Sequence, residues 1–219
     1  MLNFNLFAMK TKIKFALLIF TLLSTSLIIS CDKDDEAVVV DDTTSGLSTV
    51  DADGLLFMRE EEKLARDAYL YMHETWGTEI FYNISTSEQS HMDLLLKRIE
   101  QFELTDIAST DTGVFNNADL QDLYDQLIDS GKDSLIAGLI VGATIEEVDI
   151  VDLHKYIDAT SNEDLKCTYD VLLLGSRNHL RGFIKNLNNN NYSYTPQFLT
   201  QEKYDEIING SHEQGHSCD

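Results

Sequence analysis

The chain has 219 residues, which is enough for one domain with a substantial core and flanking segments. Its 38 acidic and 16 basic residues give a formal net charge of −22, and because such a surface repels nucleic acid and anionic membranes, we expect no nucleic-acid partner. A single proline and 11 glycines favour a mainly helical protein over a turn-rich β-sandwich or barrel.

Residues 1–30 are predicted to be an export signal, because three lysines precede an apolar run at 15–29. The segment 28–31 resembles a bacterial lipobox, which implies cleavage before Cys31 and lipidation of that cysteine. The acidic residues that follow resemble the surface-export signal of Bacteroidota lipoproteins. These resemblances imply a cell-envelope lipoprotein on the outer membrane, exposed at the cell surface and in contact with the membrane through its lipid anchor only. An ordinary secretory signal or one transmembrane helix is the alternative.

Residues 31–50 are acidic, contain Ser and Thr and show little periodicity, so we predict a lipidated tether that leads to a helical domain at 51–190. The first helical pattern spans residues 54–76. Its core positions recur at steps of four and three, at Met58, Glu62, Ala65, Tyr69 and Met72. A neighbouring register through Glu61 fits almost as well, so helix geometry does not choose between the two glutamates.

The second helix is predicted at residues 85–103, with Ser85 or Ser87 as its cap, and it carries Glu88 and His91. Their spacing of three puts both side chains on one face, which is otherwise apolar. Buried polar groups need a partner, and in a helical bundle a metal ion is one candidate. A loop at 106–117 and a short amphipathic helix at 118–129 are expected to follow.

The third long helix is predicted at residues 133–159. Glu146 falls in its apolar seam, Glu147 lies about as close to the apolar centre, and Asp149 follows Glu146 by one turn. The pattern leaves the choice between Glu146 and Glu147 open. The fourth long helix, capped by Ser161 or Asn162 and ending near residue 187, carries His179 in its core row.

Residues 191–219 are predicted to form a C-terminal extension and tail, with an extended segment and a short helix at 192–208. We interpret the tail, which contains His212, His216 and Cys218, as a solvated, frayed end, with adventitious metal binding as the alternative. The three cysteines have no spacing typical of a zinc site or a disulfide scaffold. We therefore assign them no role in the fold and leave the pairing of Cys167 with Cys218 open.

Each of the four long helices thus carries a carboxylate or an imidazole in its core row. The candidate metal ligands are Glu62, Glu88, His91, Glu146 (or Glu147), Asp149 and His179. Several carboxylates gathered without cations would repel one another and stay partly protonated, whereas two bridged divalent ions would neutralise them. Mixed oxygen and nitrogen ligands without thiolates suit iron or manganese, and zinc is a further option.

Two motifs resemble those of a known superfamily. The pattern Glu62-x-x-Ala65-x-x-x-Tyr69 is similar to the first-helix signature of ferritins and bacterioferritins, and Glu88-x-x-His91 resembles their second-helix ligand pair. The resemblance implies Glu62 rather than Glu61 as a ligand. The segments 60–67, 145–150, 176–181 and 194–199 resemble an uncharacterised ferritin-like domain family of prokaryotes. The fold that this implies is all-α, a ferritin-like four-helix bundle with one short extra helix between the second and third long helices and a short C-terminal extension.

The chain departs from the ferritin-like pattern at the fourth helix. Ferritin-like enzymes typically repeat Glu-x-x-His there, but Ser176 stands in place of the glutamate. Asp149 could replace the missing carboxylate, much as rubrerythrins place an extra Glu on the third helix. The alternative is that Asp149 does not replace it and the site holds a single ion or none. Tyr69 is then either a hydrogen-bond donor to a ligand or a core aromatic residue.

Three functions follow from these patterns. The first is a metal-binding protein with a di-iron or di-manganese carboxylate centre that reacts with oxygen or peroxide. The second is a surface-tethered, non-catalytic helical module that binds a partner or has a structural role. The third is iron capture or storage, although a lipid anchor suits a monomer or homodimer better than a large cage. The resemblance implies no established reaction.

Overall fold

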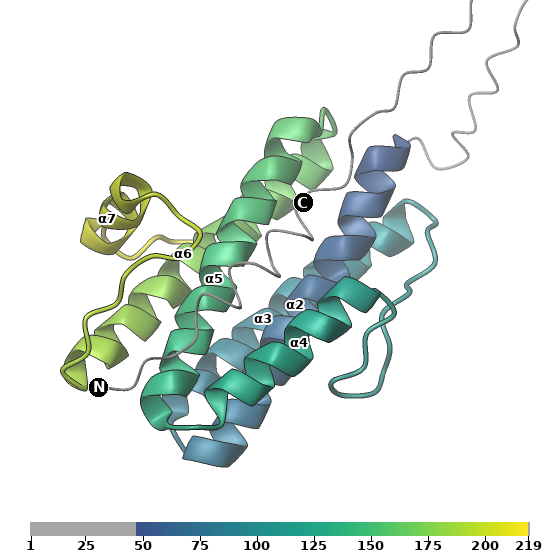
Figure 1. Ribbon diagram of the computed structural model, residues 1–219. Coiled ribbons are helices and arrows are strands. Elements are labelled where there is room, and N and C mark those ends of the chain that lie inside the picture. The colour runs from purple at the N-terminus through teal and green to yellow at the C-terminus, as the bar shows by residue number, and fades with distance from the viewer. Residues whose placement is uncertain (1–46, 219) are drawn as a thin grey trace, which may run out of the picture. The chain divides into compact units, whose positions relative to one another are not determined.

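The computed structural model describes residues 47–218, which form six α-helices and no strand. Two antiparallel helix pairs make up the bundle (Figure 1). The helices α2 (Thr49–Trp76) and α3 (Glu79–Gln101) form the first pair, and α5 (Leu135–Ala159) and α6 (Glu163–Asn189) form the second. The crossover between the pairs contains α4 (Ala118–Gly131), which packs against α2 and α5. The prediction of a helical bundle with one short extra helix in this crossover is confirmed.

The turn between α2 and α3 lies earlier in the chain than predicted. Ser48 caps α2 by accepting a hydrogen bond from the Asp51 amide, and the helix begins at Thr49, five residues before the expected start at residue 54. Gly77 ends α2 in the left-handed conformation, with φ of 62°, and α3 begins directly after Thr78. The predicted cap at Ser85 or Ser87 was wrong, because α3 begins at Glu79 and the Ser85 hydroxyl donates to the Tyr82 carbonyl inside the helix. Gly77 and Thr78 alone separate α2 from α3, whereas the sequence pattern predicted a longer connection between the two helices.

The later boundaries agree better with the prediction. Asn117 caps α4 and Asn162 caps α6, and each side chain accepts two backbone N–H groups. Ser134 caps α5, one residue after the predicted start. The short C-terminal helix is α7 (Gln201–Asn209), as expected for residues 192–208.

Apolar and aromatic layers lie on both sides of the polar residues at the middle of the bundle. Toward one end, the Phe183 ring packs against Tyr69 and Phe81, with ring centroids 5.2 and 5.8 Å apart. Toward the other end, Tyr156 packs against Tyr169 at 6.0 Å. These layers keep water away from the polar groups between them.

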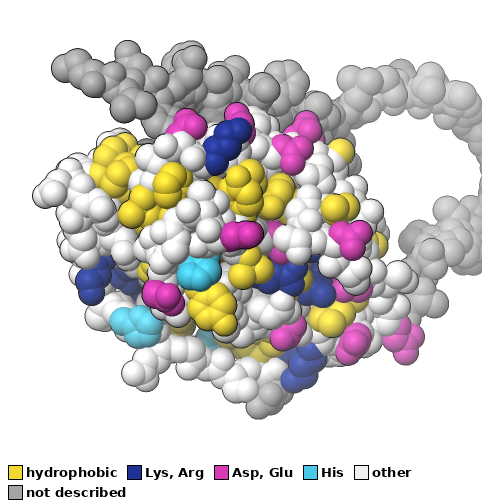
Figure 2. Space-filling model, turned by 90° about the horizontal axis from the view of Figure 1, so that it is seen from below, with side chains coloured by type: hydrophobic (Ala, Val, Ile, Leu, Met, Phe, Trp, Pro, Cys, Tyr) yellow, Lys and Arg dark blue, Asp and Glu magenta, His cyan; other side chains and the backbone are white. Residues whose placement is uncertain are grey.

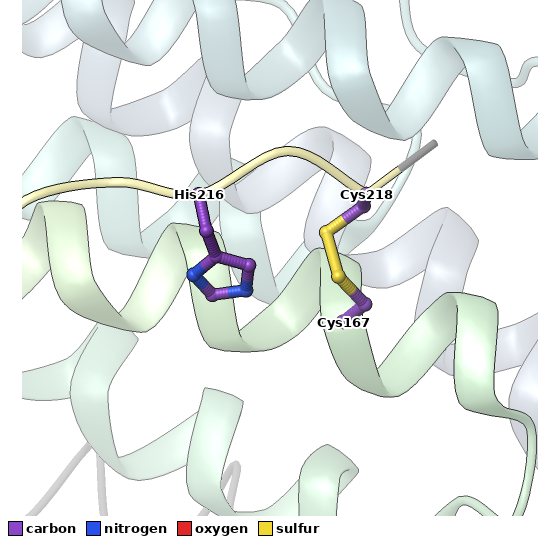
Figure 3. A group of neighbouring side chains, drawn as sticks. All are labelled: Cys167, His216 and Cys218. Atoms are coloured by element: carbon purple, nitrogen blue, oxygen red, sulfur yellow. A yellow bond between two sulfur atoms is a disulfide. The ribbon is translucent and has the colours of Figure 1, made fainter.

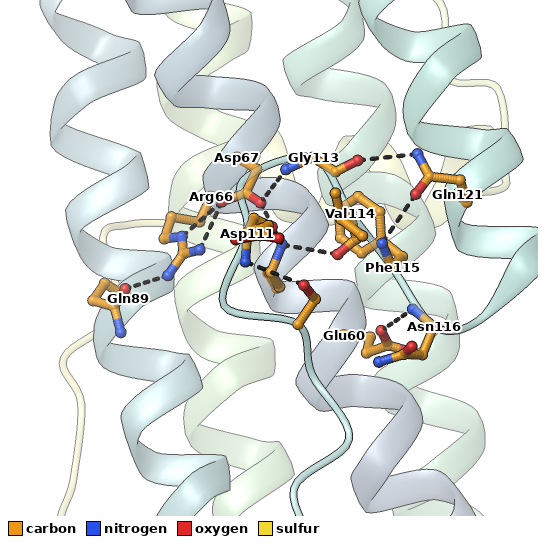
Figure 4. Close-up of polar contacts among 12 residues, drawn as sticks. Glu60, Arg66, Asp67, Gln89, Asp111, Gly113, Val114, Phe115, Asn116 and Gln121 are labelled. Carbon is orange, nitrogen blue, oxygen red and sulfur yellow. Dashed lines mark hydrogen bonds and ion pairs between the residues drawn. The ribbon is translucent and has the colours of Figure 1, made fainter.

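Buried charges on α2 fasten the crossover to the bundle (Figure 4). Lys63 Nζ donates to Asp67 Oδ2 at 2.7 Å and to the carbonyls of Asp111 and Val114. Glu60 accepts the Asn116 and Asn117 amides at 2.7 and 2.9 Å, where its charge also suits the N-terminus of α4. The polar residues of the segment 60–67 that face away from the bundle centre therefore position the crossover.

The C-terminal tail is fixed, contrary to our interpretation of a frayed end. Cys167 of α6 forms a disulfide with Cys218, so the prediction that these cysteines have no role in the fold was wrong. Glu213 forms ion pairs with Arg177 and Arg181 of α6. The disulfide joins residues 51 positions apart, a separation from which local spacing rules predict nothing.

Two features of the surface bear on the sequence predictions. On the face seen in Figure 2, acidic side chains are dispersed among polar and apolar ones instead of forming one patch. Within residues 47–218, no helix is both long enough and apolar enough to cross a membrane. The predicted export signal, Cys31 and most of the tether lie outside the described residues.

Candidate metal centre

The first group of candidate ligands joins α2 to α3. His91 Nδ1 lies 2.8 Å from Glu88 Oε2 on its own helix and 3.1 Å from Glu62 Oε2 on α2. All three side chains are buried. One oxygen of each carboxylate and one imidazole nitrogen lie within 4.8 Å of one another, which is close enough to share a metal ion.

The second group uses the same Glu88 and joins it to α5 and α6. His179 Nδ1 lies 2.9 Å from Glu88 Oε1 and 3.5 Å from Glu146 Oε2. Glu88 thus turns one oxygen toward each imidazole and belongs to both groups. A carboxylate shared in this way could contribute one oxygen to each of two metal sites.

Several polar atoms of this cluster are buried without a hydrogen-bond partner among the described residues. They are Glu62 Oε1, Asp149 Oδ1 and His179 Nδ1. His179 Nδ1 faces Glu88 Oε1 at 2.9 Å and forms an ion pair with it when the imidazole is protonated. Unsatisfied buried polar atoms are costly, and these three have the chemistry of metal ligands. The side chains therefore fit a pair of divalent cations.

Neighbouring side chains hold the candidate ligands in place. Tyr69 Oη donates a hydrogen bond to Glu146 Oε1 at 2.5 Å. Of the two roles considered for Tyr69, donor to a candidate ligand and core aromatic residue, the structure thus shows the donor. Ser176 hydrogen-bonds Asp149 Oδ2. His179 Nε2 lies 3.0 Å from Ser87 Oγ, which leaves Nδ1 facing the carboxylates. Such contacts orient ligands and select the imidazole tautomer.

Two features of the packing around the candidate ligands were not predicted from the sequence. Ser87 was predicted only as a possible helix cap. Its contact with His179 joins two helices that are far apart in the sequence, so the spacing of residues along one helix does not predict it. Gly175 leaves room for the His91 ring, since a Cβ atom at this position would lie 2.5 Å from His91 Cε1 and Nε2. Only the packing of α3 against α6 reveals that requirement.

Burial and like charges perturb the carboxyl groups of the cluster. Burial raises the pKa of Glu62 to about 7, although the ion pair with His91 opposes the shift. Burial and the Glu88 charge raise the pKa of Glu146 to about 7. Burial and the Glu62 charge raise the pKa of Asp149 well above its usual range. Burial and repulsion between neighbouring carboxylates account for these shifts.

The shared carboxylate behaves in the opposite way. Burial alone would raise the pKa of Glu88, but ion pairs with His179 and His91 hold it well below its usual range. Burial opposes protonation of His179, yet the Glu88 and Glu146 charges raise its pKa to about 10. Glu88 is therefore the negative centre around which the rest of the cluster is arranged.

The structure also separates the adjacent glutamates that periodicity could not. Glu62 lies in the ligand cluster, whereas Glu61 has both carboxylate oxygens buried and unpaired among the described residues. Burial raises the pKa of Glu61 well above its usual range, and the charge of the neighbouring Asp152 raises it further. Glu61 is thus a buried acid beside the cluster.

Glu146 and Glu147 point to different partners. Glu146 contacts Tyr69 and His179 within the cluster. Glu147 Oε2 instead accepts three consecutive backbone N–H groups, from residues 197, 198 and 199, at 2.6–2.9 Å. Glu147 therefore anchors the C-terminal extension to α5, and Glu146 is the member of the pair that faces the candidate metal site.

Comparison with known proteins gives the family. The domain family described as "Uncharacterized protein domain (DUF2202)" matches residues 51–211. The chain belongs to this family. It is 47% identical over 170 residues to the uncharacterized protein MJ0754 of Methanocaldococcus jannaschii. The aligned residues cover 77% of this chain and 92% of that protein. The expected membership of an uncharacterised domain family is thereby confirmed, and the family description gives no reaction.

A solved structure supports the architecture of the DUF2202 domain. The crystal structure of hypothetical protein MJ0754 from Methanococcus jannaschii DSM 2661 is similar, with a TM-score of 0.75 and 43% sequence identity. The similarity covers 84% of this chain and 100% of that chain. The family match includes every candidate ligand and ends at residue 211, before His216 and Cys218.

Proposed function

We propose that this DUF2202 protein binds two divalent iron or manganese ions at the middle of a ferritin-like bundle. The observation that carries the proposal is the sharing of Glu88 between two groups of ligand atoms. Glu62 and His91 would complete one site, and Glu146 and His179 the other. Four carboxylates face two imidazoles in this buried space, and two divalent cations would balance the excess negative charge.

Asp149 has a defined part in this proposal. One of its oxygens is held by Ser176, and the other is buried and unpaired among the described residues. The free oxygen can serve as a further ligand where the fourth helix lacks a glutamate. Ser176 thus supports a carboxylate supplied by α5, as the ferritin-like comparison implied.

When bound, iron or manganese would supply one-electron chemistry toward dioxygen or peroxide. The residues of the chain would position the ions and exclude bulk water from them. Tyr69 fixes the orientation of Glu146, and Ser87 holds the His179 imidazole through Nε2. The hard carboxylate oxygens suit iron and manganese, and zinc would occupy the same ligands without redox chemistry.

Metal analysis of the purified full-length protein tests the proposal. We expect about two equivalents of iron or manganese, as in other carboxylate-bridged bundles, and loss of both in a Glu88→Ala, His91→Ala double variant. Ser90→Ala is the matched control, because this exposed hydroxyl bonds only within α3. A metal-free protein whose thermal stability does not respond to a chelator would overturn the proposal.

The same measurement separates the alternative functions. Ion pairs between Glu88 and both imidazoles favour a second candidate, a non-catalytic helical module whose core polar groups satisfy one another. A metal-free, chelator-insensitive protein would support that candidate. Iron storage predicts a large assembly, so light scattering from a monomer or homodimer that takes up only a few ions would exclude it.

The lipid anchor is a separate part of the proposal. We place the protein at the cell envelope through acylation of Cys31, with the helical domain on an acidic tether and the membrane contacted by the lipid alone. The support is the lipobox-like segment at residues 28–31. Cys31→Ser should abolish labelling with a radioactive fatty acid, and continued membrane retention of that variant would contradict the anchor.

A further inference from the structure

The tail after α7 lies against the bundle through contacts that do not depend on sulfur. Asn178 of α6 exchanges two hydrogen bonds with the Glu213 backbone, each 3.0 Å long. The Glu213 carboxylate pairs with Arg177 and Arg181. Arg98 of α3 donates to the Cys218 carbonyl. The tail is therefore held on both sides of His216 by polar contacts, independently of its disulfide.

Three potential metal ligands meet beneath this tail (Figure 3). They are the two disulfide sulfurs, from Cys167 and Cys218, and one nitrogen of His216. These three atoms all lie within 4.8 Å of one another. Cys167 and Cys218 are partly buried, whereas the imidazole is exposed and accessible to ions in solution.

Reduction would turn this group into a different kind of site. A dithiol reductant that transfers two electrons and two protons to the disulfide yields two cysteine thiols and is itself oxidised to a disulfide. Because the Glu213 and Arg98 contacts remain, both thiols would stay beside the imidazole. A divalent ion could then bind two thiolates and one imidazole, with release of the two thiol protons.

We propose that Cys167, His216 and Cys218 form a redox-gated Zn²⁺ site, closed by the disulfide and opened by reduction. Two sulfur ligands and one nitrogen ligand suit zinc, with water in the fourth position of a tetrahedron. The site differs from the central cluster in its donor atoms, since thiolates select zinc where carboxylates select iron or manganese. His216 and Cys218 lie beyond the residues matched by the DUF2202 family, whereas Cys167 lies within them.

Cobalt spectroscopy tests the proposal, because only thiolate ligands give Co²⁺ a sulfur-to-metal charge-transfer band in the near ultraviolet. The sample is the full-length protein in a Cys31→Ser background, which removes the one other cysteine. After reduction, we expect this band on addition of Co²⁺ and its loss on addition of Zn²⁺. The oxidised protein should not show the band, even when its central cluster binds Co²⁺.

Variants of the tail identify the ligands. His216→Ala should lower the Co²⁺ affinity of the reduced protein by roughly tenfold or more, because one of three protein ligands is lost. His212→Ala is the matched control, since His212 is exposed on the same tail but outside the group. Absence of the band after reduction, or equal affinities in the two histidine variants, would overturn the proposal. Both substitutions are at exposed positions, so failure to fold is not expected to obscure the result.

Discussion

Replacing Glu147 by alanine separates an anchoring role from a metal-binding role at adjacent positions of α5. In the structure one oxygen of Glu147 accepts three backbone N–H groups of the C-terminal extension, and the side chain is fully buried. Removal of the carboxylate leaves three donors without their acceptor. Metal binding should survive, because Glu147 does not contact the Glu88 cluster.

The expected loss in the free energy of unfolding follows from the contacts of Glu147. Hydrogen bonds to a charged group contribute about 1.5–3 kcal/mol each, but local opening of the extension would let water reach the released amides. Glu147 Oε1 is buried and unpaired among the described residues, and losing this desolvated atom offsets part of the cost. We expect a net loss of about 3 kcal/mol, or roughly 6–12 °C in Tm for a domain of this size.

Two measurements on Glu147→Ala test this reasoning. Thermal unfolding gives the loss of stability, and hydrogen exchange should show lost protection at the amides of residues 197–199. Glu146→Ala is the matched variant, expected to lose metal while those amides stay protected. The reasoning would be refuted if Glu147→Ala lost the metal and kept the amide protection.

Two further predictions concern the packing of α6 and the tail. Gly175→Ala should displace the His91 imidazole and weaken metal binding in a chelator competition. Gly182→Ala is the control and should leave metal binding unchanged, because a Cβ atom at residue 182 would meet only the flexible ends of isoleucine side chains, at 3.2 Å or more. The hydrogen bond from Arg177 lowers the pKa of Glu213 from its ordinary value of 4.5 to about 2. The stability that this ion pair contributes is thus complete above pH ~4.5 and lost as the pH falls through about 2. Glu213→Gln should lower the free energy of unfolding at pH 7 by only about 1 kcal/mol, because the pair is partly exposed. Denaturant titrations of this variant should no longer show that pH dependence.

Periodicity identified the helices and the row of polar residues inside them, since both follow from the 3.6-residue repeat. It could not choose between Glu61 and Glu62 because α2 is covered on nearly all sides. The bundle, α4 and the crossover loop together bury residues 59–65 without interruption. A helix with no solvent-facing side gives a weak hydrophobic pattern, so the resemblance to ferritins was needed to select Glu62.

The same limit applied to Glu146 and Glu147, because the C-terminal extension covers the outer side of α5. The partner amide of Glu147 at Gln197 lies 50 positions away in the chain, and Tyr69, which contacts Glu146, lies 77 positions away. The Cys167–Cys218 disulfide spans a similar distance. Contacts of this kind depend on how the elements assemble, and no local pattern reports them.

The three adjacent glutamates of α2 place a strict condition on the length of that helix. Glu60 binds the crossover, Glu61 lies beside Asp152, and Glu62 joins the candidate metal cluster. One residue inserted or deleted between the N-terminus of α2 and this segment would rotate the preceding turns by about 100° relative to all three carboxylates. Single-residue insertions and deletions in this part of α2 should therefore be absent from functional variants.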